Sequence, residues 1–357
     1  MKILYAGVLT PGSSSLFRTL ALERLGHTVI KLDPDAYTIS NPLLAKVAFR
    51  IAAGPHADRL NRDILRLAEA ERPDVFWADK VLLLKPSTLN TLRELGIRTV
   101  SYMIDNAFGP RRDPGWRLYM KSIPLFDLHV TQRDVSVGDY LQRGAQDVIK
   151  IQTAYEPTVH FASATPMTDA ERTREVSFIG TPYDDRAEIL TRLSSDGVPV
   201  VVSGRPRAWA RALSADAYAA IYFSDELYGE QYRETIWRSK INLSFLTKSN
   251  QDEYTHKSFE IAGCGGFLMA ERSQGHELKF REGEEAVFFE SYDDLLTKIR
   301  RYLPDEASRN RIAAAGQRRA VSDGYHNDRQ MQLIVDRLAA IRSAQHSASS
   351  IAVQRGA

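Results

Sequence analysis

The chain has 357 residues, of which 43% are hydrophobic and 26% are charged, as in ordinary soluble globular proteins. Lys and Arg outnumber Asp and Glu by only 47 − 45 = 2, which argues against nucleic acid or an acidic polymer as the partner. A chain of this length exceeds what one hydrophobic core usually supports, so two domains are expected. The one cysteine, Cys264, excludes an intrachain disulfide and favours a reducing compartment.

The first half of the chain alternates strand-like and helix-like patterns, which predicts right-handed βαβ units and a parallel sheet. The N-terminal apolar run is broken by Gly7 and Pro11, so it fits a first strand better than a signal peptide. The predicted strands are 2–7, 28–32, 74–77, 99–104, 125–130 and 147–151, and the predicted helices include 16–25, 57–71 and 87–95.

The second half repeats this alternation after residues 155–174, which are rich in Pro, Thr, Ser and charge and are interpreted as a linker. We therefore predict an N-terminal Rossmann-like domain at 1–160 and a C-terminal one at 175–327, then a helix at 328–343 and a disordered tail at 344–357. The predicted strands are 175–180, 198–204, 241–245, 267–270 and 286–289, and the predicted helices are 186–194, 230–239, 292–302 and 307–321.

The segment Thr255–Glu271 is the most informative motif. Lys257 and Glu260 lie three residues apart at the start of a predicted helix, and Gly263, Gly265 and Gly266 follow before an apolar strand. A lysine could meet phosphate charge, a glutamate could accept hydrogen bonds from ribose, and glycines let the backbone approach a ligand. The alternative is a surface ion pair at i, i+3, but a glycine-rich helix is intrinsically poor, which favours a binding function.

This segment resembles the "R/K-x-F-E-x-x-A-C-G" signature of the CgeB-like glycosyltransferases. The resemblance implies the GT-B architecture, with two Rossmann-like domains whose parallel sheets face each other across a cleft. It also implies that the last helix packs back on the first domain. The implied activity is sugar transfer of the hexosyltransferase type (EC 2.4) from a nucleoside-diphosphate sugar. GT-B enzymes generally use no bound divalent ion, so we expect no metal site and no bound cofactor beyond the donor substrate.

The resemblance assigns donor-binding roles to several residues of the second domain. Lys257 and Arg186 would neutralise the diphosphate, and Glu260 would hold the ribose. Gly180 and Arg186 match an "F-x-G-x-x-x-x-R" segment between a strand and a helix, where the helix N-terminus favours an anion. The alternative is an ordinary loop glycine with a surface arginine. Ser203 and Gly204 follow a valine-rich strand and would line the base or ribose.

Three further residues near the signature are donor-site candidates. Asp252 lies eight positions before Glu260, where retaining GT-B enzymes often carry a glutamate that contacts the sugar. Asp252 could equally be a solvated loop residue, and its side chain is one methylene shorter than glutamate. His256 could reach a phosphate or be a bystander, and Gly265 would let the backbone approach the ligand.

In the first domain, Asp105 ends a predicted strand and faces the expected cleft. An acceptor hydroxyl needs a general base or an orienting acceptor, so Asp105 is the catalytic candidate on this side, with Lys257 and Glu260 on the other. Asp105 could instead cap the loop that follows. The remaining acceptor-side candidates are Asn106, Arg111, Gly12 and Ser13.

The expected partners are a nucleotide sugar and a small-molecule, glycan or protein acceptor, in the cytoplasm. No segment reaches the ~20 apolar residues that a membrane span needs. Residues 41–72 carry an apolar stripe with two cations, which favours a packed surface helix but leaves peripheral membrane contact open. Two other functions remain open: a nucleotide-sugar epimerase of the same fold, and a non-catalytic module that binds a sugar nucleotide or a glycan.

Overall fold

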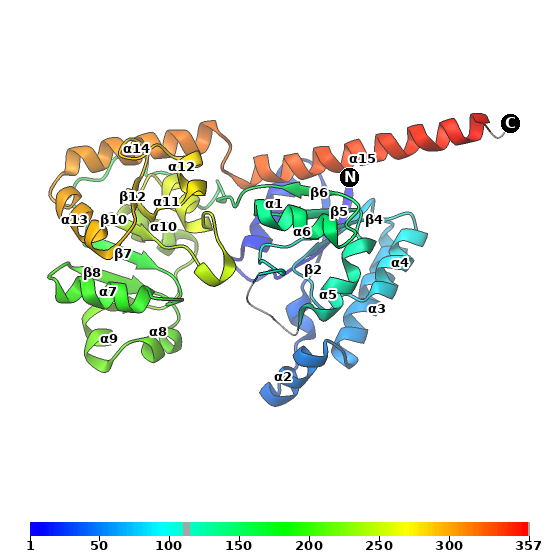
Figure 1. Cartoon of the computed structure of the whole chain (residues 1–357), viewed down its shortest axis with the longest axis horizontal. Helices are drawn as coiled ribbons and strands as arrows, with labels where there is room; N and C mark the ends of the chain where they lie inside the picture. The colour runs from blue at the N-terminus through cyan, green and yellow to red at the C-terminus, as the bar shows by residue number, and fades with distance from the viewer. Residues whose placement is uncertain (110–114, 356–357) are drawn as a thin grey trace. The chain divides into compact units, whose positions relative to one another are not determined.

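The structure is a computed structural model that describes residues 1–109 and 115–355. It divides into two compact units, Met1–Gln152 with Asp328–Ala357, and Thr153–Asn327. Each unit is built on a parallel six-stranded sheet with helices packed against it (Figure 1), which confirms the predicted α/β class with two Rossmann-like sheets.

In the first unit the strand order is β2-β1-β3-β4-β5-β6, and every pair of neighbours is parallel. β1 lies beside β2 with Lys2 opposite Thr28, and beside β3 with Ile3 opposite Val75. All six predicted strands of this half are therefore confirmed. Their bounds are β1 Lys2–Ala6, β2 Thr28–Leu32, β3 Val75–Asp79, β4 Arg98–Tyr102, β5 Leu128–Thr131 and β6 Val148–Lys150.

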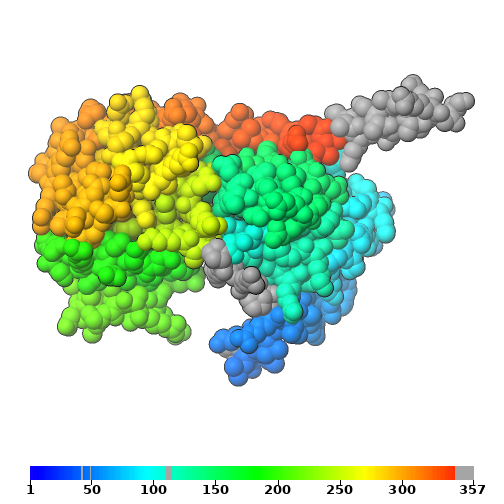
Figure 2. Space-filling view, in the orientation of Figure 1, coloured from blue at the N-terminus to red at the C-terminus, as the bar shows by residue number. Residues whose placement is uncertain are grey.

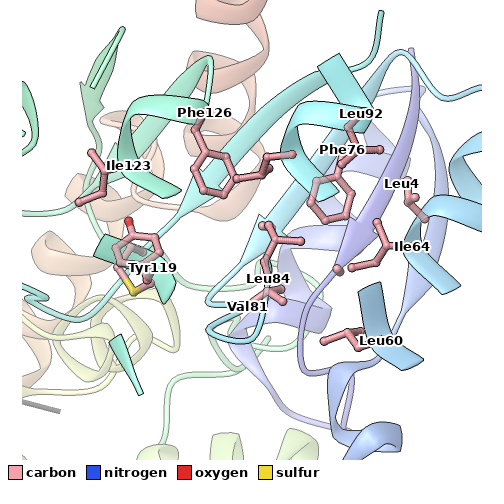
Figure 3. Packing of buried hydrophobic residues seen from close by; sticks show 14 of the residues in the cluster. Leu4, Leu60, Ile64, Phe76, Val81, Leu84, Leu92, Tyr119, Ile123 and Phe126 are labelled. Atoms are coloured by element: carbon pink, nitrogen blue, oxygen red, sulfur yellow. The ribbon is translucent and has the colours of Figure 1, made fainter. Parts of the chain in front are cut away.

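Alternation along the strands of the first unit produces a core on each face of the sheet. One face carries Leu4 and Phe76, which pack with Ile64 and Leu92 from helices (Figure 3). The opposite face carries Ile3, Tyr5, Val75 and Trp77, which pack with Ala21, Leu22, Met331, Ile334 and Leu338.

The helices of the first unit begin and end where proline and glycine predict. Pro42, Pro55 and Pro86 occupy first helical positions, and Gly26 has φ +82° directly after the first helix. The last helix continues to Arg355 and so includes residues 344–355, for which the sequence predicts disorder. The bounds are α1 Ser14–Arg24, η1 Pro34–Tyr37, α2 Pro42–Ile51, α3 Pro55–Glu71, α4 Pro86–Glu94, α5 Trp116–Ser122, η2 Ile123–Leu125, α6 Asp134–Gln142 and α15 Asn327–Arg355.

In the second unit the strand order is β12-β11-β10-β7-β8-β9, again all parallel. The edge strand β9 was not predicted, because it has only three residues, none of them buried, and pairs with β8 across a register shift. The bounds are β7 Arg174–Ile179, β8 Val200–Ser203, β9 Tyr222–Ser224, β10 Ser239–Ser244, β11 Leu268–Glu271 and β12 Val287–Phe289.

Helices α9, α12, α13 and α14 of the second unit begin at side-chain caps. Ser273, Ser291 and Asp305 each accept a hydrogen bond from a backbone N–H three residues further on. The bounds are α7 Arg186–Ser195, α8 Pro206–Ala212, α9 Ala215–Ile221, α10 Gly229–Trp237, η3 Lys248–Asn250, α11 His256–Gly263, α12 Gln274–Lys279, α13 Tyr292–Tyr302 and α14 Glu306–Ser322.

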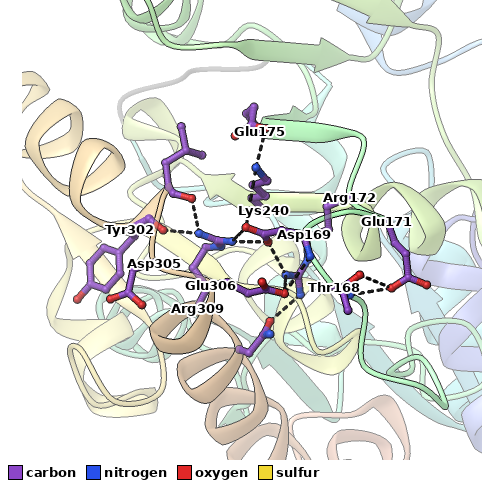
Figure 4. A network of polar contacts seen from close by, with 12 residues as sticks. Thr168, Asp169, Glu171, Arg172, Glu175, Lys240, Tyr302, Asp305, Glu306 and Arg309 are labelled. Carbon is purple, nitrogen blue, oxygen red and sulfur yellow. Dashed lines mark hydrogen bonds and ion pairs between the residues drawn. The ribbon is translucent and has the colours of Figure 1, made fainter.

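An ionic network ties the segment before β7 to α14 (Figure 4). Arg309 is 1% exposed and contacts Asp169 at 2.6 Å, and Arg172 contacts Asp169 at 3.0 Å. Burial alone would raise the pKa of Asp169, but the hydrogen bonds from Arg309 and Arg172 lower it below its ordinary value. Residues that the sequence assigns to a linker are thus held to the second unit, whose first residue is Thr153.

We predict that Asp169→Asn destabilises the protein by roughly 2–3 kcal/mol, because it leaves the buried Arg309 guanidinium without its carboxylate. Chemical denaturation followed by tryptophan fluorescence measures this change. The matched control is Asp293→Asn, since Asp293 is 88% exposed and lies 3.6 Å from Arg192. The control should change stability by less than about 0.5 kcal/mol. Equal effects of the two substitutions would contradict a structural role for Asp169.

Candidate functional site

Helix α11 carries the signature residues and follows β10 at the carboxyl edge of the second sheet. Ser258, Phe259, Ile261 and Ala262 are buried, whereas Lys257 and Glu260 are only half-buried on the remaining face. Carboxyl ends of parallel strands are where ligands bind in α/β sheets, so this face is the natural candidate.

A chain of hydrogen bonds between uncharged groups anchors the N-terminal turn of α11. Ser244 of β10 lies 3.0 Å from both the Thr255 and Ser258 hydroxyls, and Ser258 Oγ lies 2.8 Å from His276 Nε2. His276 Nδ1 lies 2.8 Å from the Glu271 carbonyl oxygen, which can only accept. His276 therefore carries its proton on Nδ1, and Ser258 donates to Nε2. Burial lowers the pKa of His276 to about 4, which keeps the ring neutral.

Lys257 is a half-buried cation without an ionic partner. Among the described residues its ammonium makes no hydrogen bond or ion pair, and Nζ lies 5.6 Å from the centroid of the Tyr232 ring. Burial lowers the pKa of Lys257 and Arg186 lowers it further, while Glu260 opposes this. A bound anion could therefore supply the negative charge in direct contact with the Lys257 ammonium.

Glu260 is an ionised acceptor beside this cation. The Tyr232 hydroxyl donates a 2.5 Å hydrogen bond to Glu260 Oε2. Burial would raise the pKa of Glu260, but the nearby His160, Lys257 and His256 and the Tyr232 hydrogen bond lower it overall. Within the described chain the other carboxylate oxygen has no hydrogen bond, so it can accept one from a ligand hydroxyl.

The structure brings Gly180, at the end of β7, against Lys257. A Cβ on Gly180 would lie 3.0 Å from Lys257 Cε and 2.9 Å from Phe178 Cζ, so any larger residue would displace the lysine stem. Two motifs whose residues Gly180 and Lys257 are 77 positions apart in the sequence therefore lie against each other.

Ser203 and Gly204, at the end of β8, pack against the same loop. A Cβ on Gly204 would lie 2.2 Å from the Gly180 carbonyl oxygen, and its φ of +156° also favours glycine. Ser203 is buried, and its Oγ accepts a 2.9 Å hydrogen bond from Ser224. Gly204 thus permits a close backbone approach between two loops of the protein itself.

Arg186 is engaged with the backbone rather than presented to solvent. It is 6% exposed, and its guanidinium donates to the carbonyls of Thr181 (3.1 Å) and Leu246 (3.0 Å) and to the Thr247 hydroxyl (3.0 Å). Burial lowers its pKa, although Asp184 and Asp252 oppose this. These bonds hold the loop after β10 against the loop after β7, which differs from the direct diphosphate contact that the sequence suggests.

The other donor-side candidates fall into two places. Asp252 lies in the loop between β10 and α11 and accepts a 2.8 Å hydrogen bond from Asn250, while His256 is the first residue of α11. Gly265 lies at the opposite end of α11 from Lys257. Its φ of +69° and its hydrogen bond from N–H to the Ala262 carbonyl show that it ends the helix.

On the first unit, Asp105 lies just beyond β4 and forms a 2.5 Å ion pair with Lys80, which follows β3. Asn106 is buried and accepts a hydrogen bond from the Phe108 N–H, as a loop-capping residue does. Gly12 has φ +82°, and Ser13 caps α1. Arg111 lies outside the described residues.

A buried cluster at the same sheet edge was missed by sequence reasoning. Arg18 and Asp79 are 2% exposed at their side chains and pair at 2.7 Å, and the Tyr5 hydroxyl also donates to Asp79. Burial raises the pKa of Tyr5, and Asp79 raises it further. His160, beside Glu260, was missed as well, because it lies in the predicted linker. No local pattern marks either group.

In the part of the chain that the structure describes, no three His, Cys, Asp or Glu residues gather as metal ligands would. The helices there also include none whose length and apolarity would suffice to cross a bilayer.

We predict that acid weakens the protein through His276. Its folded pKa of about 4 lies below the ordinary value of 6.5, so the unfolded chain takes up the proton first and stability falls as pH drops from about 6.5 to 4. His276→Phe should remove part of this pH dependence of the unfolding free energy. His129→Phe in the other unit should remove a similar part, because burial lowers the pKa of His129 to about 4 as well. An unchanged pH profile in His276→Phe would contradict the assignment.

Residues 185–336 match a family model described as glycosyl transferase-like. No curated protein sequence matches the chain significantly. Similar solved structures include HepE of Anabaena in complex with UDP-glucose, at 13% identity and TM-score 0.65 over 95% of this chain and 100% of that one. Sucrose-phosphate synthase of Thermosynechococcus elongatus has 12% identity and TM-score 0.69 over 96% and 100%.

A glycosyltransferase from Rickettsia africae is similar at 12% identity and TM-score 0.66, over 95% of this chain and 98% of that one. Identities this low establish the fold and not the activity. The chain therefore has the GT-B fold of glycosyltransferases, and most of its second unit also matches the glycosyl transferase-like family model.

Proposed function

We propose that this protein is a metal-independent glycosyltransferase that moves a sugar, of the hexosyl type, from a nucleoside-diphosphate sugar to an acceptor hydroxyl. The observation that carries the proposal is that two charged groups lie close together on α11. One is the Lys257 ammonium, which makes no ion pair among the described residues, and the other is the ionised carboxylate of Glu260. A nucleoside diphosphate offers the complementary chemistry, since it has phosphate charge at one end and ribose hydroxyls at the other.

In the proposed reaction the acceptor oxygen forms a bond to the anomeric carbon, and the bond from that carbon to the diphosphate oxygen breaks. The diphosphate leaves with the bonding electrons and the acceptor proton passes to a base. Lys257 stabilises the charge on the diphosphate. Glu260 accepts a ribose hydrogen bond, and Asp105 of the first unit is the proposed base.

The neighbouring residues act as positioning groups in this proposal. Arg186 holds the loops after β7 and β10 through its hydrogen bonds to backbone carbonyls, and Gly180 makes room for the Lys257 stem. Asp252 and His256 remain candidates for the sugar and the phosphate. The signature at Lys257–Gly265 supports the finer hypothesis of a bacterial, cytoplasmic, CgeB-like enzyme.

UDP is the first nucleotide to test, because HepE, which shares the fold, was solved with UDP and with UDP-glucose. Lys257→Met should weaken UDP binding by about 10- to 100-fold, the worth of a hydrogen bond to a charged group. Titration calorimetry measures the affinity. The melting temperature should stay the same or rise, because an unpaired half-buried charge costs free energy.

The matched control is Lys248→Met, which removes the same charge from a nearby exposed lysine that pairs with Asp185 at 2.7 Å. Its UDP affinity should stay close to that of the unmodified protein. A large loss of stability in Lys257→Met with unchanged UDP affinity would make Lys257 structural and overturn the proposal. Conversion of UDP-glucose to an isomer without acceptor would favour an epimerase instead.

Alkaline pH should weaken UDP binding through Lys257. The charged ammonium is the binding form, and its lowered pKa brings its deprotonation to a lower pH than for an ordinary lysine. We expect the ratio of the affinity of the unmodified protein to that of Lys257→Met to fall between pH 7 and pH 10. Use of the ratio cancels the titration of the nucleotide itself. A constant ratio would mean that the Lys257 charge does not contribute to binding.

A further inference from the structure

A pocket of about 440 Å³ lies wholly within the first unit, at the carboxyl edge of its sheet. Its wall comes from the residues after β1, η1 and the loop that follows it, α2, α3 and the segment Asp79–Leu83 after β3. This volume lies in the range of small-molecule sites, roughly 300–1,000 Å³.

The wall of this pocket is mainly apolar. It includes Val8, Ile39, Ala48, Leu60, Val81 and Leu82. A sugar in such a pocket would lose water from many hydroxyls without regaining hydrogen bonds, at a cost of roughly 1–3 kcal/mol for each unpaired group.

Polar groups of the wall are largely committed to the protein. The Asp79 carboxylate accepts hydrogen bonds from Arg18 and Tyr5, and the Tyr37 hydroxyl donates to Asp63 at 2.8 Å. The exceptions are His56, whose Nδ1 is buried and has no hydrogen-bond partner among the described residues, and the charged side chains of Asp35 and Lys46, which are exposed to solvent and make no hydrogen bond or ion pair there. One ligand hydroxyl could satisfy His56, but this does not make the pocket a site for a polyol.

One residue of the pocket wall contacts the proposed base. Lys80 lines the pocket and pairs with Asp105 at 2.5 Å. Lys80 also has φ +55°, a left-handed conformation that costs a non-glycine residue about 1–2 kcal/mol, and its N–H donates to the Tyr102 carbonyl at 2.9 Å. Such strain concentrates at functional sites.

α2 carries apolar residues both at the pocket and on its exposed side. Ala45 and Ala48 of this helix line the pocket, while its outer side exposes Leu43, Leu44 and Val47 at 74%, 59% and 56%. α2 stands out from the body of the first unit (Figure 2). Exposed apolar residues gathered on one helix in this way often mark a binding surface.

We infer that this pocket binds the apolar body of the acceptor, so that the acceptor is an alcohol with an alkyl or aryl body and not a sugar. The inference rests on the proposed function and names its second substrate class. The hydroxyl end lies towards Lys80 and Asp105, where the proton is removed, and the apolar body lies against Leu60, Val81 and α2.

The test uses 2-naphthol as a compact aryl alcohol and cellobiose as a sugar of comparable size, each titrated against the full chain by calorimetry. Ala45→Trp fills the pocket and should weaken 2-naphthol binding at least tenfold. The matched control is Ala70→Trp, on an exposed position of α3 outside the pocket, which should bind 2-naphthol like the unmodified protein. Val8→Trp, at a position 36% exposed, gives the same answer if Ala45→Trp does not fold.

Binding of 2-naphthol that neither pocket-filling variant weakens would overturn the inference. Cellobiose binding that these variants abolish would also overturn it, since the pocket would then take a sugar. The proposed function is tested separately, through UDP binding, and its failure would be distinguishable from these outcomes. UDP affinity depends on Lys257 in the other unit, so Ala45→Trp should leave UDP binding unchanged and Lys257→Met should leave 2-naphthol binding unchanged. Absence of UDP binding together with pocket-dependent 2-naphthol binding would reject the donor site but not the apolar pocket.

Discussion

The candidate site depends on the hydrogen bond between Ser258 and His276, because it fixes α11 without using a charge. Ser258 donates to a neutral imidazole whose other nitrogen donates to a carbonyl, so the chain of donors and acceptors is closed inside the second unit. A salt bridge in the same place would have consumed the ionic groups that a donor site needs. The helix is thus held by neutral partners on its buried side, and its two charges remain on the other.

Lys257 differs from the buried arginines Arg18, Arg186 and Arg309 in the hydrogen-bond partners of its charged group. Arg18, Arg186 and Arg309 are each 6% exposed or less, and each makes hydrogen bonds to a carboxylate or to backbone carbonyls. These hydrogen bonds offset part of the desolvation, although burial still lowers the pKa of Arg186, and through them the arginines organise loops and helix ends. The Lys257 ammonium makes no such hydrogen bond among the described residues, and burial lowers its pKa although Glu260 opposes this. An incoming diphosphate would relieve this cost, which is why an incompletely paired cation is a stronger sign of binding than a paired one.

Much of the fold could be predicted from local pattern, because each strand of a covered parallel sheet is nearly continuous in apolar residues. The strand around Ile3 and Tyr5 and the helix stop at Gly26 are examples. The site was predictable to the extent that it lies in one short segment, as Lys257 and Glu260 do. The role of each glycine could not be predicted from the sequence. Gly180 makes room for Lys257, whereas Gly265 ends a helix. Only the backbone φ angle and the neighbouring atoms distinguish the two roles. The burial of Arg186 could not be predicted for the same reason, since it depends on loops far away in sequence.

The apolar pocket shows the limit of reading sequence most clearly. Its wall combines residues after β1, in η1, α2 and α3, and at and after the end of β3, which are far apart in the sequence. Conversely, the apolar stripe of α2 is visible in the sequence, but the sequence does not show that one side of this helix lines a pocket. Parallel sheets create this situation generally, because the carboxyl ends of several strands deliver separate loops to one edge. The sheet can therefore be inferred from periodicity, while the chemistry at its edge is decided by which loops meet there.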